Sequence, residues 1–245
     1  MTKRILALLL LVGLAASASA TPWGDVVNHA APGAIKPFAL DLGGLLGGSA
    51  FHSGRSIGFP GFDVGVVAMT QFHPDRDNAI LKATADHAFG LPLVQAEVGL
   101  PFNFDVIAHG VGYGGASIVG GGLRYGLWRT SMLDPLPDIS ISAFGDKLNQ
   151  KYFNATHYSV NASVSWALPI LHPYAGVGYD ITKVTLSPTL PSVAGVSVAG
   201  DSATARGTRL TVGLDVSPLP LVHAFAAYSL RHGEPGVDIG VGARF

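Results

Sequence analysis

Cysteine is absent from the 245-residue chain, so disulfide bonds contribute nothing to its stability. Charged residues are also scarce: they make up 13% of the sequence, against about a quarter in ordinary soluble domains. The 15 basic and 16 acidic residues nearly balance, so the chain lacks the basic surface that nucleic-acid binding requires, and we expect no nucleic-acid partner. Glycine, in contrast, is abundant at 32 residues. This composition favours one large β domain whose outer surface is poorly hydrated.

Long apolar runs are missing apart from one at the N-terminus. Lys3 and Arg4 precede an apolar run at 5–16, and small residues occupy 18–20. This is the pattern of a secretory signal peptide with cleavage after Ala20, and the run is too short to favour a transmembrane anchor. No cysteine follows the cleavage position, which excludes a lipoprotein anchor. We therefore expect export through the Sec pathway.

The last nine residues alternate between apolar and other side chains without a break. One face of the expected strand carries Val237, Ile239, Val241, Ala243 and Phe245, and the other carries Asp238, Gly240, Gly242 and Arg244. In a soluble protein this would be an apolar edge strand and an aggregation hazard. In a lipid-embedded barrel it would be a closing strand with one face to hydrocarbon and one to the lumen. The segment resembles the C-terminal signature of bacterial outer-membrane β-barrels, and the resemblance implies that the assembly machinery reads Phe245.

The same period of two recurs along the chain and predicts ten strands. They cover residues 62–73, 94–100, 102–109, 119–128, 139–143, 158–168, 175–182, 209–216, 222–231 and 237–245. Prolines fall in the connections after the second, fourth, sixth and eighth strands, whereas the connections after odd strands are expected to be longer, notably 74–91 and 187–205. Long loops on one side and short turns on the other are typical of outer-membrane barrels, and an even strand count places the C-terminus on the periplasmic side.

Residues 21–60 are rich in Gly and Pro and show no strand pattern. Within this lead-in, residues 38–46 are apolar at mixed spacing. They could form a short amphipathic helix or a plug inside the barrel, or they could lie against the barrel mouth.

The two faces of the strands predict which side chains meet lipid and which line the lumen. Aromatic residues on the lipid side are candidates for the interfacial girdles: Tyr125, Tyr158, Trp166, Tyr174, Tyr228 and Phe245. The charged and histidine residues on the other face are the lumen candidates: Glu97, Asp105, His109, Arg124, Asp180, Arg209, Asp215, His223, Arg231, Asp238 and Arg244. Opposite charges can pair across neighbouring strands, and unpaired buried charge is costly. We therefore favour a lumen filled by salt bridges over an open, selective pore.

Nine histidines raise the question of catalysis or metal binding. Ser229 with His223 or His232 could form a lipase-like pair, but no spacing enforces it. Five histidines fall near expected strand ends or in loops: His73, His87, His157, His172 and His232. The loop at 75–77, with Asp86 and His87, could bind a cation, although a solvated loop is the simpler reading. We expect no enzyme activity, no cofactor and no metal site.

Taken together, the sequence predicts an all-β protein: a closed antiparallel transmembrane barrel of about ten strands, within about 8 to 12. The expected organisation is a signal peptide at 1–20, a lead-in at 21–60 and the barrel at 61–245. We expect a monomer in the bacterial outer membrane that contacts lipid and the barrel-assembly machinery. It would serve as an envelope protein or as a narrow passive channel for small solutes. Transport of small apolar molecules gated by the lead-in, a lipid-modifying enzyme and a soluble secreted β-protein are the alternatives.

Overall fold

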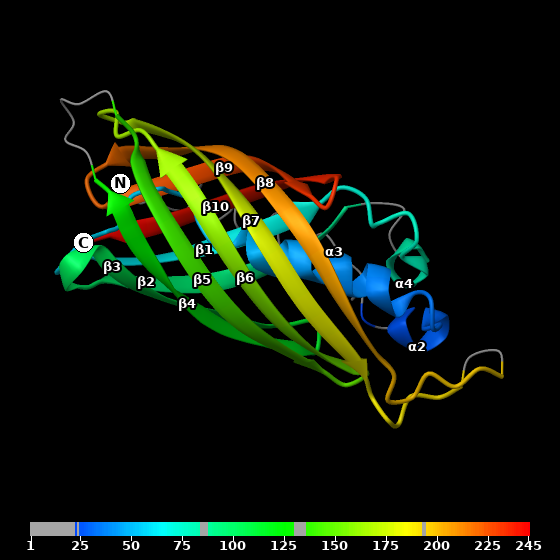
Figure 1. The fold of residues 1–245 in the computed structure, drawn as a ribbon. Helices are drawn as coiled ribbons and strands as arrows, with labels where there is room; N and C mark the ends of the chain where they lie inside the picture. Colours follow the sequence, from blue (N-terminus) through cyan, green and yellow to red (C-terminus); the bar gives the residue numbers. More distant parts are fainter. Residues whose placement is uncertain (1–22, 24, 84–87, 130–135, 193–194) are drawn as a thin grey trace, which may run out of the picture.

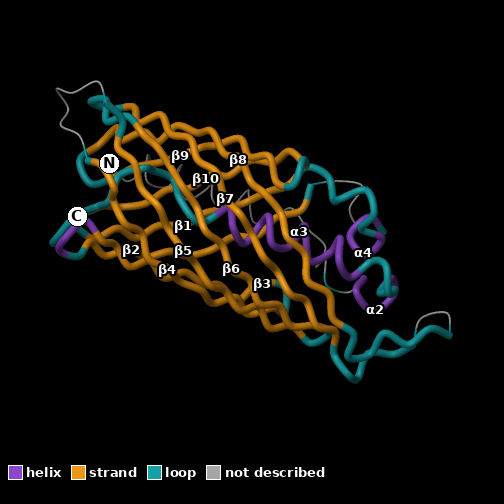
Figure 2. The backbone as a smooth tube through the Cα atoms, in the orientation of Figure 1, coloured by secondary structure: helices purple, strands orange, loops and turns teal. Residues whose placement is uncertain are grey.

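The computed structural model describes residues 23, 25–83, 88–129, 136–192 and 195–245, so the predicted signal peptide lies outside the described residues. Ten antiparallel strands form a closed barrel, with short helices at one end and one helix inside it (Figures 1 and 2). The strands are β1 (Phe62–Gln71), β2 (Phe89–Gly99), β3 (Phe104–Tyr113), β4 (Ala116–Trp128), β5 (Asp138–Gln150), β6 (Phe153–Ser165), β7 (Leu171–Leu186), β8 (Ser202–Leu219), β9 (Val222–Arg231) and β10 (Glu234–Arg244). The helices are α2 (Asp25–His29), α3 (Ile35–Gly48), α4 (Ala79–Lys82) and the short 3-10 helix η1 (Pro101–Asn103).

The first and last strands close the barrel. β1 and β10 pair from Asp63 opposite Arg244 to Gln71 opposite Gly236. Beyond this ladder, Phe62 and Phe245 exchange two backbone hydrogen bonds of 3.0 and 2.7 Å. Every strand therefore has two neighbours, and the predicted closed antiparallel architecture is confirmed. Closure leaves no strand edge, which is the condition for a sheet to exist in hydrocarbon.

The two ends of the barrel differ. We call the end at which β1 begins and β10 finishes the terminal end, and the opposite end, which carries α2 and α4, the helical end (Figure 1). At the helical end, residues 72–88 and 187–201 form long connections. The other three connections there have two residues each: 114–115, 151–152 and 232–233. The prediction of generally longer loops on this side is thus wrong for three of the five connections.

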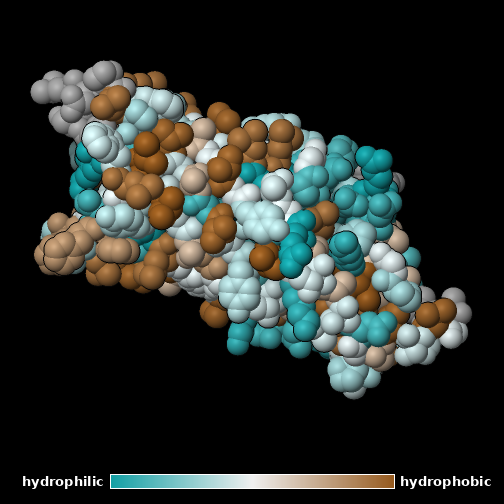
Figure 3. Space-filling model, viewed as in Figure 1, coloured by the Kyte–Doolittle hydropathy of each residue, from teal (hydrophilic) through white to brown (hydrophobic). Residues whose placement is uncertain are grey.

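The outer wall changes from apolar to polar along the strands. On three strands the exposed side chains change from apolar near the terminal end to charged nearer the helical end: Ile141 to Lys147 on β5, Val177 to Lys183 on β7, and Leu210 to Arg206 on β8. On the face seen in Figure 3, apolar surface gathers over the terminal half of the barrel and polar surface toward the helical end. This pattern is that of a barrel whose terminal half lies in a bilayer and whose helical end projects into water.

Two aromatic side chains mark the borders of the apolar band: Tyr158 on β6, and Trp166 directly after the end of β6. Tyr158 and Trp166 are 60% and 39% exposed. Eight residues of strand tilted by about 40° span about 20 Å along the barrel axis, close to the height of the apolar band in outer-membrane barrels. Tyr125, Tyr228 and Phe245 also face outward, as predicted for the girdle.

Tyr174 does not belong to this girdle, and the prediction that it does is wrong. Its side chain is 2% exposed, because it has the same parity on β7 as Gly176 and Asp180 and therefore points inward. Tyr174 pairs with Gly213 on β8, and a β-carbon at Gly213 would collide with the Tyr174 ring. The absent side chain provides the space for the ring.

The lead-in runs through the lumen. α3 enters from the helical end, and residues 49–61 continue to the terminal end, where β1 begins (Figures 1 and 2). Pro37 is tolerated because it lies in the first helical turn, where backbone N–H groups lack intrahelical partners. Within the described residues, no helix is long and apolar enough to cross a membrane. The sequence left open whether the lead-in forms a plug inside the barrel or lies against the barrel mouth. The structure shows the plug.

Candidate functional site

The centre of the site is the contact between α3 and the barrel wall. Asp41 is the only carboxylate of α3, and it is fully buried. It accepts hydrogen bonds from Gln71 Nε2 at 2.7 Å and Asn78 Nδ2 at 2.6 Å. The backbone N–H of Asp75 (2.9 Å) and His232 Nε2 (2.9 Å) complete its environment. One side chain thus ties the helix to β1, to the loop at 72–88 and to the turn between β9 and β10.

Apolar packing fixes the outer half of the helix. Phe38 is 1% exposed and meets Phe153 of β6 edge-on, with ring centroids 5.1 Å apart and an interplanar angle of 84°. Trp23 packs against the same Phe153 ring at 5.4 Å. Edge-to-face pairs at this separation are favourable beyond the area that they bury. The helix is therefore held by packing at its start as well as by the Asp41 hydrogen bonds.

Glycine faces the wall where α3 lies deepest. A β-carbon at Gly44 would lie 3.0 Å from Cβ of Arg231, and one at Gly47 would meet the carboxylate of Asp180. Arg231 in turn donates from Nε to the carbonyl oxygen of Gly44 at 3.0 Å. A guanidinium on a carbonyl in the C-terminal half of a helix also matches the helix dipole. This face of α3 fits the wall only because it carries no side chains.

Behind the helix, the wall carries a chain of alternating histidines and aspartates. His109 Nε2 lies 2.5 Å from Asp146, whose other oxygen lies 2.6 Å from His157 Nδ1. His157 Nε2 reaches Asp180 at 3.3 Å, and Asp180 is paired with Arg209 at 3.4 Å. These side chains come from β3, β5, β6, β7 and β8, and all are buried. We refer to these five residues as the His–Asp chain; it compensates buried charge across half of the barrel circumference.

Two further charged clusters fill the lumen. Arg231 pairs with Asp238, which also accepts a hydrogen bond from Ser229. Toward the terminal end, Arg124 pairs with Glu97 and, at 3.0 Å, with Asp105. The Asp105 carboxylate also accepts the backbone N–H of Ile57 at 3.1 Å, so the wall binds the 49–61 segment as well as α3.

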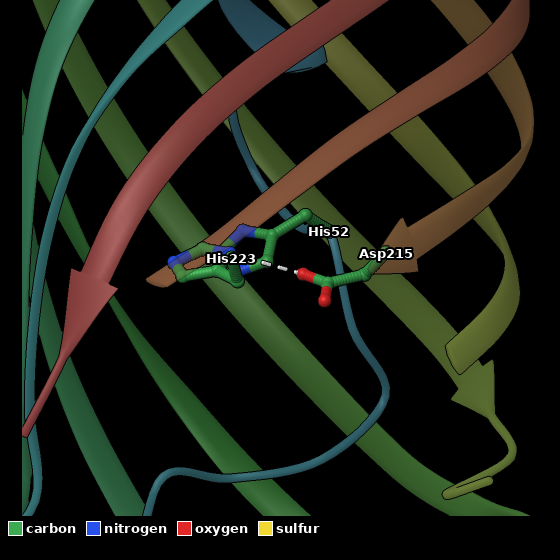
Figure 4. A group of neighbouring side chains, drawn as sticks. All are labelled: His52, Asp215 and His223. Carbon is green, nitrogen blue, oxygen red and sulfur yellow. Dashed lines mark hydrogen bonds and ion pairs between the residues drawn. The ribbon is translucent and has the colours of Figure 1, made fainter. Parts of the chain in front are cut away.

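A fourth group, of histidines and aspartates, lies between the end of α3 and the terminal end of the barrel. His223 is hydrogen-bonded to Asp215 through Nδ1 and to Asp63 through Nε2, both at 3.1 Å. The His52 ring from the 49–61 segment stacks on the His223 ring, with centroids 5.3 Å apart (Figure 4). Arg244 is paired with Asp63 at 2.9 Å.

The structure places the lumen candidates inside the barrel. Ten of the eleven are buried, and Arg244, at the terminal end, is partly exposed: Glu97, Asp105, His109, Arg124, Asp180, Arg209, Asp215, His223, Arg231 and Asp238 make up the buried set. They fall into separate paired groups distributed along the lumen. Two of these groups are completed by residues that the sequence did not single out as lumen candidates: Asp146 and His157 in one, and Asp63 and His52 in the other.

Several of those completing residues were missed, and two could have been found. Asp146 lies on β5, which continues to Gln150 although the sequence predicts a strand ending at 143. His157 is predicted at a strand end, but β6 begins at Phe153 and His157 is buried within it. Extending the period of two would have placed both inside. Asp41 and His52 belong to the lead-in, where no period exists.

The suggested catalytic pair is not assembled. His223 and Ser229 are six residues apart on one strand, which separates them by about 20 Å. Ser229 is hydrogen-bonded to Asp238, and His232 to Asp41. In the suggested cation loop, the Asp75 carboxylate accepts a hydrogen bond from the backbone N–H of Asp77. The other two candidates of this loop, at 86 and 87, lie outside the described residues.

The hollows bounded by described residues do not form an obvious binding pocket. One hollow, of about 1040 Å³, lies on the outer wall, where Leu123, Val160 and Leu210 are exposed. Inside, about 240 Å³ remain at the terminal end, and about 10 Å³ lie beside His52. Together, α3 and the 49–61 segment fill the rest of the lumen that the described residues enclose.

Comparisons with known proteins leave the function open. No protein-family model matches the chain, and no curated protein matches it. Solved structures do match. The N-terminal β-barrel domain of OprF from Pseudomonas aeruginosa is 14% identical, with a TM-score of 0.39 over 78% of this chain and 99% of that one. The translocator domain of the autotransporter NalP from Neisseria meningitidis is 13% identical, with a TM-score of 0.36 over 77% and 89%. Neisserial surface protein A is 12% identical, with a TM-score of 0.31 over 75% and 95%.

These similarities are too distant to indicate what the protein does. The strand closure, the apolar band and the polar, plugged lumen nevertheless agree with one another. The protein is a closed, ten-stranded antiparallel barrel with an apolar outer band and a polar lumen that its own N-terminal segment fills.

Proposed function

We propose that this protein is an envelope barrel whose own N-terminal segment keeps the lumen closed, so that it conducts no solutes in its resting state. The observation that carries the proposal is the occupation of the lumen by α3 and the 49–61 segment. Gln71, Arg231 and Asp105 of the barrel wall bind this plug at successive levels. A salt-bridged lumen wall satisfies buried charge without leaving a hydrated path.

The proposal includes an orientation. The terminal end faces the periplasm and the helical end faces outward, because the exposed strand surface is apolar toward the first and charged toward the second. In this orientation Phe245 is available to the barrel-assembly machinery after Sec export. The barrel closes within one chain, so a monomer suffices. No catalytic role is included, since Ser229, His223 and His232 are each engaged elsewhere.

Planar-bilayer recordings of the mature protein, refolded in detergent, test the proposal. We expect no steady single-channel conductance from the full chain. A variant lacking residues 25–48 should conduct, because it removes α2 and α3 and leaves the barrel strands intact. Steady conductance by the full chain, at a level matching that of the deletion variant, would refute a closed resting state.

A gated channel for small solutes is the second candidate. The wall behind α3 favours it, because Asp180, Arg209 and Arg231 would line a hydrated pore if the helix withdrew. The same charges disfavour the transport of small apolar molecules, because an apolar molecule in the pore would separate these charged groups from water. Conductance of the full chain that appears only above a threshold voltage and has the ion selectivity of the deletion variant would support the gated channel over the purely structural role.

A further inference from the structure

Metal-ligating side chains converge at one point near the terminal end. His52 from the 49–61 segment, Asp215 from β8 and His223 from β9 are all buried (Figure 4). Each offers one ligand atom, and these atoms lie within 4.8 Å of one another. Asp215 and His223 lie on the neighbouring strands of one hairpin, whereas His52 is distant in sequence and meets them because the plug threads the barrel.

The distances at His223 match those of a metal site. Its Nδ1 lies 3.1 Å from Oδ2 of Asp215. Around a tetrahedral zinc ion, two ligand atoms at bond lengths of 2.0–2.2 Å lie about 3.3–3.5 Å apart. Exchanging the proton shared by this pair for an ion therefore requires movement of a few tenths of an ångström.

The other nitrogen of His223 has the partner that metal-bound histidines usually have. Its Nε2 lies 2.9 Å from a carboxylate oxygen of Asp63. A carboxylate on the far ring nitrogen fixes the tautomer and raises the basicity of the coordinating nitrogen. Asp63 is itself paired with Arg244 at 2.9 Å, so its charge is partly compensated with or without an ion.

A second, independent observation is the state of Asp215. Its Oδ1 is buried and has no hydrogen-bond partner among the described residues. His172 Nδ1, on the adjacent strand β7, lies 3.5 Å from this oxygen, too far for a good hydrogen bond. A buried carboxylate oxygen without a hydrogen bond is costly, and a cation would satisfy it.

The site also has room beside it. The 240 Å³ cavity at the terminal end is lined by His172, Asp215 and Arg244, so a hydrated ion could reach Asp215 from that side. Imidazole nitrogen and carboxylate oxygen together suit zinc and its first-row neighbours rather than calcium or magnesium.

We propose that His52, Asp215 and His223 bind a zinc-class transition-metal ion, with water from the adjoining cavity in the fourth position, and that this ion fastens the plug to the barrel wall. A metal ion bound by a histidine nitrogen lies in the plane of that imidazole ring, so an ion shared by two histidines must lie in both ring planes. The His52 and His223 rings are stacked at an interplanar angle of 19°, so their planes do not meet at such a point. One ring must turn on binding. His52 is the ring that turns, since it lies in the 49–61 segment outside the sheet. The proposal does not depend on whether the barrel conducts.

Zinc titration of the untagged mature protein tests the site. The protein is refolded in detergent, stripped with chelator and titrated by calorimetry, with heat-modifiable gel mobility as the check of folding. We expect one ion per chain with a Kd below about 100 µM. His52→Ala should weaken binding at least tenfold, and it changes no strand residue. His73→Ala, which alters an exposed histidine in a loop, should leave binding unchanged.

A second variant and a spectroscopic measurement keep the test decisive. Asp215→Asn retains the shape of the side chain and should also weaken binding at least tenfold. Cobalt bound to the unmodified protein should show the visible absorption of a tetrahedral site, and His52→Ala should lose it. Absence of binding by the folded protein, or equal losses in His52→Ala and His73→Ala, would overturn the proposal.

Discussion

Replacing Asp41 by alanine should release α3 from the wall without opening the barrel. The substitution removes the acceptor for two fully buried amides, Gln71 Nε2 and Asn78 Nδ2. Leaving a buried donor unpaired costs about 1–3 kcal/mol, so these two amides alone destabilise the docked helix by at least about 2 kcal/mol. The bonds from Asp75 and His232 are partly exposed, and water can replace them.

A loss of about 2 kcal/mol corresponds to an opening equilibrium about thirtyfold larger. Hydrogen–deuterium exchange in detergent micelles measures it directly, because the backbone amides of α3 exchange only when the helix unfolds or undocks. We expect the amides of 42–48 to exchange about thirtyfold faster in Asp41→Ala, while amides in the middle of β5 and β6 remain at their original rates.

Asp201→Ala is the matched control, since Asp201 is an exposed acidic residue in the connection between β7 and β8. It should leave exchange in α3 within about threefold of the unmodified protein. If Asp41→Ala also stayed within that range, the hydrogen bonds of Asp41 would not hold the plug, and the reasoning from buried donors would fail.

Three further predictions concern orientation, the glycine face and assembly. The chain contains no cysteine, so single cysteines can report the orientation. Asn28→Cys at the helical end should react with a membrane-impermeant maleimide on intact cells, whereas Leu168→Cys at the terminal end should react only after lysis. The reverse result would show that the orientation is opposite to the one proposed. Gly47→Ala should speed exchange in α3, although alanine favours helix by about 1 kcal/mol, because the new methyl group meets the carboxylate of Asp180; slower exchange would contradict the close fit. Deleting Phe245 should reduce the heat-modifiable fraction recovered from outer membranes, and undiminished recovery would show that assembly does not read this residue.

The strands could be predicted from the sequence because successive side chains face two different environments in turn. Hydrocarbon outside and a polar interior impose a period of two, so the parity of Asp180 or Arg231 already places each in the lumen. Strand ends were harder. Near the helical end the outer wall becomes polar, as at Lys147, so the alternation of apolar and polar residues fades and β5 was predicted too short.

The plug could not be located by the same reasoning. α3 meets apolar rings at Phe38, hydrogen-bond donors at Asp41 and the wall itself at Gly44, so no single apolar stripe marks its environment. The cluster at His52 and His223 was equally hidden. It joins a segment before the first strand to the ninth strand, and only the threaded topology brings the two together.

The central claim is that α3 lies inside the barrel, and a disulfide test addresses it most directly. A β-carbon at Gly43 would lie 3.1 Å from Cβ of Thr182, close to the separation of about 3.5–4.5 Å found in disulfides. The double variant Gly43→Cys with Thr182→Cys should therefore form an intramolecular disulfide in outer membranes, seen as a mobility shift on denaturing gels that reductant reverses. Moving the second cysteine by one residue, to Lys183→Cys, places it on the outer wall and should abolish the bond. A missing bond at 182, or equal bonding at 182 and 183, would contradict the plugged lumen.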